Sequence, residues 1–131
     1  MMLLFVKIMS YVYVIKQNAM TYHKNTLFDA DLQGIAILAK TLSHPARLAI
    51  LRYLANSDTC ISGDISDEIP LSRTTVSQHL QELKRAGLIH GEIEGTKVCY
   101  CICMDKVDSA FNMLNTFFEE IMTVNTNVCE K

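Results

Sequence analysis

The sequence has no histidine after His90, no low-complexity tract and no internal repeat. It also has no unbroken apolar run of about 20 residues, the length that crosses a membrane as a helix. Paired carboxylates placed for acid–base chemistry, a nucleophile with its base and a glycine-rich phosphate loop are likewise absent. We therefore expect a protein that is not an enzyme and has no membrane partner. The 131 residues, half of them hydrophobic, suffice for one domain with its own core.

Net charge is also small. The formal net charge is −2 at pH 7, so no overall basic field marks a nucleic-acid binder. The region from 71 to 97 is balanced too, and its charged residues are Arg73, Lys84, Arg85, Lys97, Glu82, Glu92 and Glu94. This balance argues against strong non-specific DNA binding. A dimer could still read a short operator, because two half-sites add their contacts.

The cysteines are odd in number and lack the spacing of a secreted disulfide framework. They are Cys60, Cys99, Cys101, Cys103 and Cys129. We therefore expect a cytoplasmic protein whose reduced thiols are available for metal or redox chemistry.

The first fifteen residues, Met1 to Ile15, are almost all apolar. The run is too short for a transmembrane helix, and it lacks the basic start and cleavage site of a signal peptide. We expect residues 1–28 to be an N-terminal extension. It is either functionally neutral, or a wrongly assigned start with Met20 as the more ordinary N-terminus, or an extra helix or strand that packs on the domain or on a partner. Residues 29–124 form the predicted domain, and residues 125–131 form a C-terminal tail.

Residues 71–89 predict one helix with two different faces. Its apolar stripe has the spacing i, i+4, i+7 and consists of Val76, Leu80 and Leu83. Ser72 is a suitable N-cap, and Gly87 is a suitable residue just past the end. The opposite face carries Thr74, Ser77, Gln78, Gln81 and Arg85. A helix with such hydrogen-bonding side chains can lie in a DNA major groove and touch base edges.

Three helices are expected before this one. Apolar spacing predicts the first near residues 29–41 and the second after Ser43-His44-Pro45, where a cap residue precedes a proline. A short helix, roughly residues 63–69, should bury Ile65 and Ile69 and stop at Pro70. The short helix, a tight turn and the longer helix together make a helix-turn-helix.

A β-hairpin and a long helix complete the domain. Residues 88–93 and 96–103 alternate around a turn at Glu94-Gly95, which predicts a wing. The last helix carries a heptad seam of Val107, Phe111, Leu114, Phe118 and Ile121. We expect this seam to form a homodimer interface, with capping of its own domain as the alternative. The predicted fold is mainly α with a β-hairpin wing, a winged helix-turn-helix that dimerises through terminal helices.

This order of elements and three phrases resemble the ArsR/SmtB family. The phrases are Leu42-Ser43-His44-Pro45-Ala46-Arg47-Leu48-Ala49-Ile50-Leu51, Thr75-Val76-Ser77-Gln78-His79-Leu80, and Gly87-Leu88-Ile89 followed by Gly95 and Tyr100. The resemblance runs from about Asp29 to Ile121. It implies a dimeric winged-helix repressor that leaves its operator when an inducer binds, often a metal ion or metalloid.

The resemblance also implies which residues contact DNA. The positions that match the family's base- and backbone-contacting residues are Arg73, Thr74, Ser77 and Gln78. Gln81 shares their face, and Thr96 and Lys97 lie on the wing, where phosphate contacts are expected. The alternative for this helix face is an ordinary solvated surface. His79, beside the apolar stripe, is interpreted as a packed, hydrogen-bonded histidine rather than a ligand.

The arsenic-responsive branch of the family carries a Cys-x-Cys pair at the start of the short helix that precedes the DNA-contacting helix, here residues 71–89. Cys60 matches the first position, but Ser62 stands at the second. Because As(III) and Sb(III) prefer thiolates, a serine hydroxyl is a poor substitute. Cys60 alone cannot hold such an ion, so further thiolates must come from the cysteines of the predicted strand. We therefore predict that the metal ligands are Cys60, Cys99 and Cys101.

Strand geometry and composition bear on the other cysteines. Cys99, Cys101 and Cys103 alternate on one predicted strand and share a face at intervals of about 6.6 Å. Cys129 could reach across from the tail, and the alternative for every cysteine is packing as a small hydrophobe. The family's zinc site of histidine and acidic ligands on the last helix is not expected, because no histidine follows His90.

The sequence thus predicts a cytoplasmic, homodimeric repressor with no required cofactor, released from operator DNA by a thiophilic inducer such as As(III) or Sb(III). Two alternatives stay open. One is a repressor that senses thiol oxidation or persulfide without metal. The other is a winged-helix protein–protein interaction module, which would show no salt-dependent DNA binding.

Overall fold

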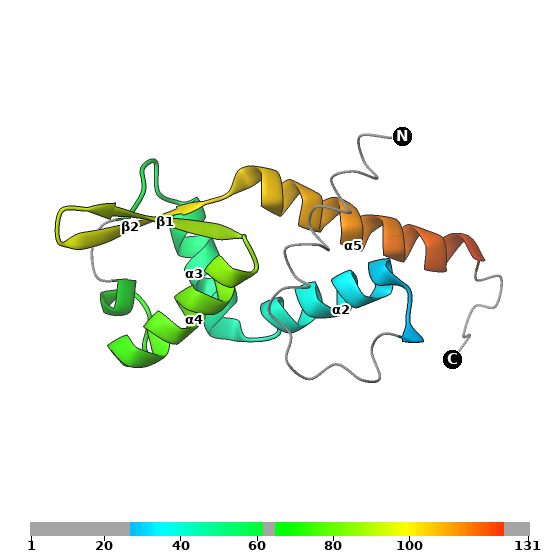
Figure 1. Ribbon diagram of the computed structural model, residues 1–131, viewed down its shortest axis with the longest axis horizontal. Helices are drawn as coiled ribbons and strands as arrows, with labels where there is room; N and C mark the ends of the chain where they lie inside the picture. Colours follow the sequence, from blue (N-terminus) through cyan, green and yellow to red (C-terminus); the bar gives the residue numbers. More distant parts are fainter. Residues whose placement is uncertain (1–26, 62–64, 125–131) are drawn as a thin grey trace.

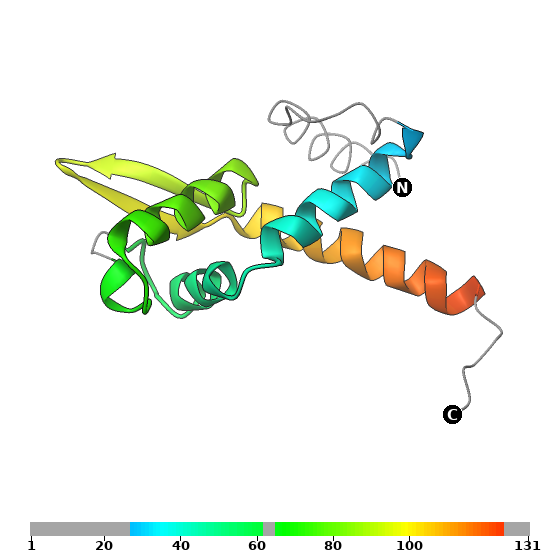
Figure 2. The same cartoon turned by 90° about the horizontal axis from the view of Figure 1, so that it is seen from below.

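The computed structural model describes residues 27–61 and 65–124. Its elements are α2 (Ala30–Leu42), α3 (Pro45–Ala55), the 3-10 helix η2 (Ile65–Asp67), α4 (Arg73–Arg85), β1 (Ile89–Glu94), β2 (Lys97–Ile102) and α5 (Met104–Val124). Figure 1 shows α3, α4 and the hairpin gathered at one end, with α2 and α5 at the other. Seen from below, α2 and α5 diverge toward their outer ends (Figure 2). The prediction of a mainly α fold with a β-hairpin wing is confirmed.

The core lies where the helices meet the root of the hairpin. Its least exposed large side chains are Leu38, Ile50, Leu83 and Ile89. They come from α2, α3, α4 and β1 and belong to one hydrophobic cluster. Ala110 and Met113 of α5 join the same cluster. This packing holds α4 in a defined position relative to the hairpin.

The ends of α4 follow from local chemistry. The Ser72 hydroxyl accepts a hydrogen bond from the backbone N–H of Thr75 and so caps the helix. Gly87, just past the other end, has a φ of +78°, which glycine adopts without strain. Both capping predictions are confirmed, and the helix runs between these caps, from Arg73 to Arg85, within the predicted residues 71–89.

Helix α3 starts within Ser43-His44-Pro45, as predicted. The N-cap is His44, and Nδ1 of His44 accepts from the backbone N–H of Ala46. The Ser43 hydroxyl instead donates to the carbonyl of Lys40, at the end of α2. Pro45 occupies the first turn as predicted.

Two expectations need correction. Within the described residues, the short helix before α4 is a single 3-10 turn, because the Glu68 N–H bonds to the Ile65 carbonyl and Pro70 follows soon after. Ile65 and Ile69 are nevertheless buried as predicted. The hairpin turn lies one residue later than expected, at residues 95–96, because residues 94 and 97 pair. Residues 1–15, Ser62 and Cys129 lie outside the described part.

The hairpin gains a third segment from the chain before α4. β1 and β2 pair in antiparallel register. On the other edge of β2, Ile61 pairs with Tyr100, and the N–H of each donates to the carbonyl of the other at 2.9 Å. The segment that leads into the helix-turn-helix is thereby fastened to the wing.

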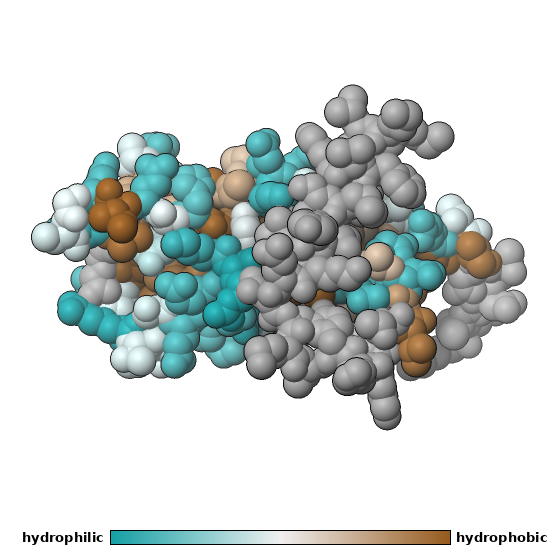
Figure 3. All heavy atoms as spheres, viewed as in Figure 1, coloured by the Kyte–Doolittle hydropathy of each residue, from teal (hydrophilic) through white to brown (hydrophobic). Residues whose placement is uncertain are grey.

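Exposed apolar side chains occur at both ends of the molecule. Figure 3 shows them over the hairpin, and again where α2 begins and α5 ends. Ile93 is 82% exposed on the hairpin, while Leu27 and Val124 are 83% and 81% exposed at the opposite end. Of the described helices, none combines the length and apolar character needed to span a bilayer.

Candidate functional site

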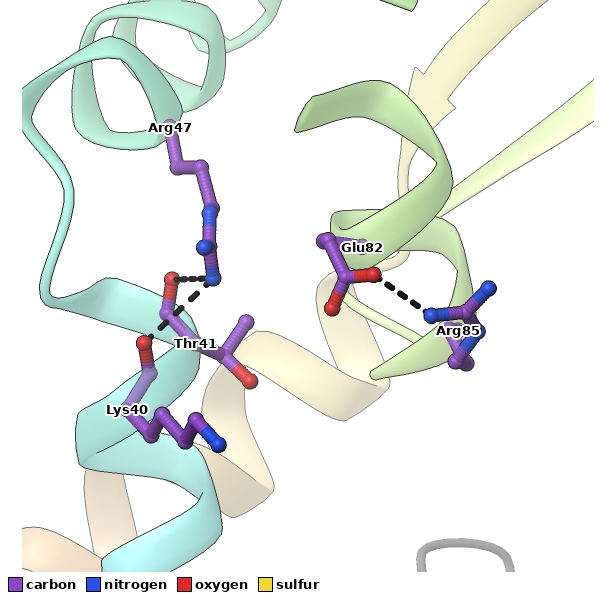
Figure 4. Close-up of polar contacts among 5 residues, drawn as sticks. All are labelled: Lys40, Thr41, Arg47, Glu82 and Arg85. Carbon is purple, nitrogen blue, oxygen red and sulfur yellow. Dashed lines mark hydrogen bonds and ion pairs between the residues drawn. The ribbon is translucent and has the colours of Figure 1, made fainter. Parts of the chain in front are cut away.

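Helix α4 separates its side chains as the sequence predicts. Its buried residues are Val76, His79, Leu80 and Leu83. The predicted DNA-contacting residues of the helix are all exposed, namely Arg73, Thr74, Ser77, Gln78 and Gln81. Arg85 pairs with Glu82 on the same helix (Figure 4). The exposed face therefore offers hydroxyl and amide groups, which can donate to and accept from base edges.

Arg47 holds the corner between α2 and α3. Its Nη1 donates to the carbonyl of Thr41 at 2.7 Å and to that of Lys40 at 3.3 Å (Figure 4). These carbonyls lie in the last turn of α2, where the helix leaves acceptors without intrahelical partners. The cation therefore stabilises the end of one helix from the start of the next.

The wing is exposed and of mixed charge. Thr96 and Lys97, predicted to meet phosphate, lie exposed at the hairpin turn and the start of β2. Glu92 and Glu94 are exposed on the adjacent strand. Contact with a phosphate backbone is therefore favoured at the turn rather than along β1.

The structure joins Cys60 and Cys101 in a disulfide, with Cα atoms 4.7 Å apart. Ile61 and Tyr100 exchange both backbone hydrogen bonds. The neighbouring antiparallel pair, Cys60 and Cys101, is therefore a non-hydrogen-bonded pair. Side chains of such a pair approach closely, and their Cα atoms lie about 4.5 Å apart. Cys60 is exposed and Cys101 is half-buried. The two cysteines predicted to share a site are brought together, but as a disulfide rather than as thiols.

Two described cysteines are free, Cys99 and Cys103. Cys99 is buried, and desolvation raises the pKa of its thiol, with further increases from Glu94 and Glu92. Less thiolate is therefore available at neutral pH than from an ordinary exposed cysteine. Cys103 lies just past β2, where its N–H donates to the carbonyl of Leu88.

The predicted metal ligands can be placed, but not as one set. Across residues 27–61 and 65–124, no three histidine, cysteine or acidic side chains converge in a way that could hold a metal ion. In the disulfide form, Cys60 and Cys101 have no thiolate to offer. The set of Cys60, Cys99 and Cys101 stays a prediction for the reduced protein.

Two histidine rings meet between α3 and α4. The centroids of His44 and His79 are 4.2 Å apart, and the ring planes are inclined by 39°. His79 is only 9% exposed, as expected for a packed histidine. Its Nε2, however, is buried and has no hydrogen-bond partner among the described residues. Burial lowers the pKa of His79, His44 and Arg47 lower it further, and Glu82 opposes them.

Sequence reasoning missed the pairing of Ile61 and the ring contact of His44. The first had a weak local signal, because Thr59 and Ile61 are β-branched residues on either side of Cys60. The second had none, because His44 was interpreted only as part of a helix restart. Nothing near it in the sequence indicates His79 as its neighbour.

The predicted dimer seam on α5 divides between two environments. Val107 and Leu114 are half-buried against the core. Phe111, Phe118 and Ile121 are 63%, 56% and 46% exposed. The exposed three form an apolar face on the outer side of α5.

Comparisons with known proteins cover the same elements. Residues 42–92 match a family described as a helix-turn-helix domain. The HTH-type transcriptional regulator YgaV of Escherichia coli (strain K12) is 30% identical over 89 residues, which cover 68% of this chain and 90% of that protein. The Biofilm growth-associated repressor of Agrobacterium fabrum is 32% identical over 84 residues, covering 64% of this chain and 71% of that protein.

A solved structure is similar as well. It is the homodimeric winged helix-turn-helix DNA-binding domain of a possible ArsR-family transcriptional regulator from Mycobacterium bovis. It is 26% identical with a TM-score of 0.51, and the match covers 86% of this chain and 98% of that one. Sequence and fold comparisons therefore agree over the helix-turn-helix.

Proposed function

This chain belongs to the ArsR/SmtB family of winged helix-turn-helix transcriptional repressors, and on that premise we propose that it binds operator DNA as a homodimer and leaves it when an inducer acts on the thiols of Cys60 and Cys101. Helix α4 lies in the major groove, and the hairpin turn lies against the adjacent backbone. We infer the inducer site from one observation, the pairing of these cysteines next to the Ile61–Tyr100 bridge.

The exposed face of α4 supports base reading. Gln78 and Gln81 each present an amide that can donate and accept at once, as adenine edges require. Thr74 and Ser77 add hydroxyls beside them. Because the region carries little net charge, affinity must come from many short-range contacts, which a dimer doubles.

The outer face of α5 supports dimerisation. Phe111 and Phe118 lie one heptad apart and are both more than half exposed. Apolar side chains repeated at this spacing are typically shielded from water by packing against a second helix. A second copy of α5 presents the same seam and satisfies a two-fold interface.

The two cysteines link the parts of the chain that face DNA in this proposal. Cys60 precedes η2 and α4, whereas Cys101 lies on β2 of the wing. A ligand or bond that joins their sulfur atoms restricts the position of the wing relative to α4. An inducer shifts operator binding only if it has different affinities for the DNA-bound and the DNA-free arrangement of the wing and α4.

As(III) or Sb(III) is the first candidate inducer. Both ions prefer thiolates, and two cysteines already held side by side form a preorganised donor pair once they are reduced. Cys99, two residues from Cys101 on the same strand, is the predicted third donor, at a spacing of about 6.6 Å. Burial raises the pKa of Cys99, so its proton must be displaced by the ion.

Redox control without metal is the second candidate, and the disulfide itself favours it. In a reducing compartment a disulfide is usually transient and redox-sensing. In this version a peroxide or a persulfide donor oxidises the two thiols, and a thiol reductant restores them. The exposure of Cys60 gives such reagents access.

Fluorescence anisotropy on the DNA upstream of the chain's own gene tests both candidates. Reduced protein bound to this DNA is titrated with As(III), with Sb(III), and separately with hydrogen peroxide or polysulfide. We expect As(III) to release the wild type and to leave Cys60→Ser bound. Cys103→Ser is the matched control, because Cys103 is outside the pair, and it should be released like the wild type.

Other outcomes point elsewhere. Release by peroxide and not by As(III), lost in both Cys60→Ser and Cys101→Ser, would establish redox control instead. Release of Cys60→Ser at the As(III) concentration that releases the wild type would contradict the inducer site. An absence of salt-dependent DNA binding would contradict the repressor and favour the protein–protein module.

A further inference from the structure

The contact between α3 and α4 is built around two imidazoles. His44 caps α3 through Nδ1, which accepts from the Ala46 N–H. That nitrogen carries no proton while the cap is formed. The His79 ring packs against it at 4.2 Å from the buried face of α4. Helix α4 therefore rests partly on a contact between two imidazole rings.

The surroundings offer little to a protonated His79. Its Nε2 is buried without a hydrogen-bond partner in the part of the chain that the structure describes. The charged and titratable groups that face it are His44 and Arg47 of α3 and Glu82 of α4. Glu82 is already paired with Arg85. A buried charge that lacks an acceptor is costly, so the neutral ring is the one that fits.

Arg47 of α3 also acts on this contact. Its Nη1 donates to the carbonyls of Lys40 and Thr41 at the end of α2. The same guanidinium places a positive charge on the α3 side of the contact. A proton added to His79 therefore increases repulsion within the contact between α3 and α4.

We propose that the contact between His44 and His79 makes operator binding sensitive to acid. Neutral rings hold α4 against α3 in its reading position, and protonation loosens this packing and weakens binding to the operator. The inference deepens the proposed function and rests on it, because it concerns the same helix.

The direction follows from proton linkage. Burial lowers the pKa of His79 in the packed arrangement, so packed α4 binds fewer protons than loosened α4. The packed arrangement is therefore most stable when the pH is above the ordinary histidine pKa of about 6.5. It loses stability as the pH falls below that pKa. Each unit of difference in pKa corresponds to about a tenfold change in the packing equilibrium.

The test compares operator and random duplexes of equal length, with the reduced full chain, from pH 7.5 to pH 5.5 at constant ionic strength. The ratio of the two affinities removes the general gain in DNA attraction as histidines become charged. For the wild type we expect this ratio to fall, by at most about tenfold, which is the full contribution of one histidine with an ordinary pKa of about 6.5 over this range. His79→Phe keeps a ring against His44 but cannot be protonated, so its ratio should change much less. His90→Gln, at an exposed histidine on β1, is the matched control and should follow the wild type.

A second variant and an NMR titration keep the inference testable if His79→Phe does not fold. His44→Asn retains a good N-cap and removes one imidazole, so it should reduce the acid effect. The His79 ring proton should titrate below pH 6.5 in the wild type. A constant affinity ratio in the wild type, an equal fall in His79→Phe, or titration of His79 above 6.5 would overturn the inference. Failure to bind the operator at pH 7.5 would instead contradict the proposed function.

Discussion

Helices α4 and α5 both carry apolar side chains at helical spacing, and they bury them in different ways. In α4 the stripe of Val76, Leu80 and Leu83 is at most 6% exposed, so the chain covers it by itself. In α5 the chain covers Ala110 and Met113 but leaves Phe111 and Phe118 more than half exposed. One helix is amphipathic toward its own core, and the other has apolar residues on two faces.

The difference comes from where each helix lies. Helix α4 packs against α3, η2 and the hairpin, so its stripe meets side chains of its own chain along its length. Helix α5 has 21 residues, or about 30 Å, and extends beyond the core that its inner face contacts (Figure 1). A hydrophobic pattern therefore indicates which face of a helix will be buried. The tertiary structure decides whether that face packs against its own chain.

The largest expected effect breaks the α4 side of this comparison. Leu83 is fully buried, and Leu83→Ala leaves a cavity in the hydrophobic core cluster. We expect the free energy of unfolding to fall by about 2–5 kcal/mol. Urea denaturation measures this loss. Thr74→Ala, on the exposed face of the same helix, should change it by about 0.5 kcal/mol or less, and equal losses would contradict the comparison.

The α5 side is tested by a charge on its outer face. Phe118 is 56% exposed, so Phe118→Glu should leave the fold of the single chain intact. If α5 is the dimer interface, the charge is buried there, and the dimer dissociation constant should rise about 100-fold or more.

Sedimentation equilibrium measures the dissociation constant. Thr116→Glu places the same charge on an exposed residue about 200° away around the helix and should leave it unchanged. An intact dimer for Phe118→Glu would show that this face is covered in another way. Leu114 is a less selective position for such a charge, because its side chain also packs on the core.

The smallest effect sharpens the assignment of the polar face of α4. Gln78→Ala removes an exposed amide without touching the buried stripe. We expect it to weaken operator binding by about 1–3 kcal/mol and to leave binding to random DNA nearly unchanged. Lys97→Ala on the wing should instead weaken both by similar factors and lower the salt dependence. Equal losses on the two DNAs for Gln78→Ala would remove this residue from base reading.

Much of α4 was predictable because its signals are local. Ser72, Gly87 and the spacing of three apolar residues act within one or two turns of the helix, and the structure confirms each of them. The hairpin was predictable as an element for the same reason. Its turn was placed one residue early, because residues 94–96 do not by themselves distinguish the two registers.

The candidate site was only partly predictable. Cys60 and Cys101 were assigned to one site from a family resemblance and strand alternation. Their direct pairing depends on the Ile61–Tyr100 bridge, which the sequence does not indicate. The same holds for the distribution of the α5 seam, where five similar apolar residues have different surroundings.

What the sequence by itself determined about this protein is which residues become helix or strand and which face of each is apolar, because caps, prolines, glycines and side-chain spacing act over short distances. The tertiary structure alone decided that Cys60 meets Cys101 and that His44 packs on His79. It also decided that α5 keeps an uncovered apolar face. These contacts join residues far apart in the chain, and they form only when whole elements pack together around the core.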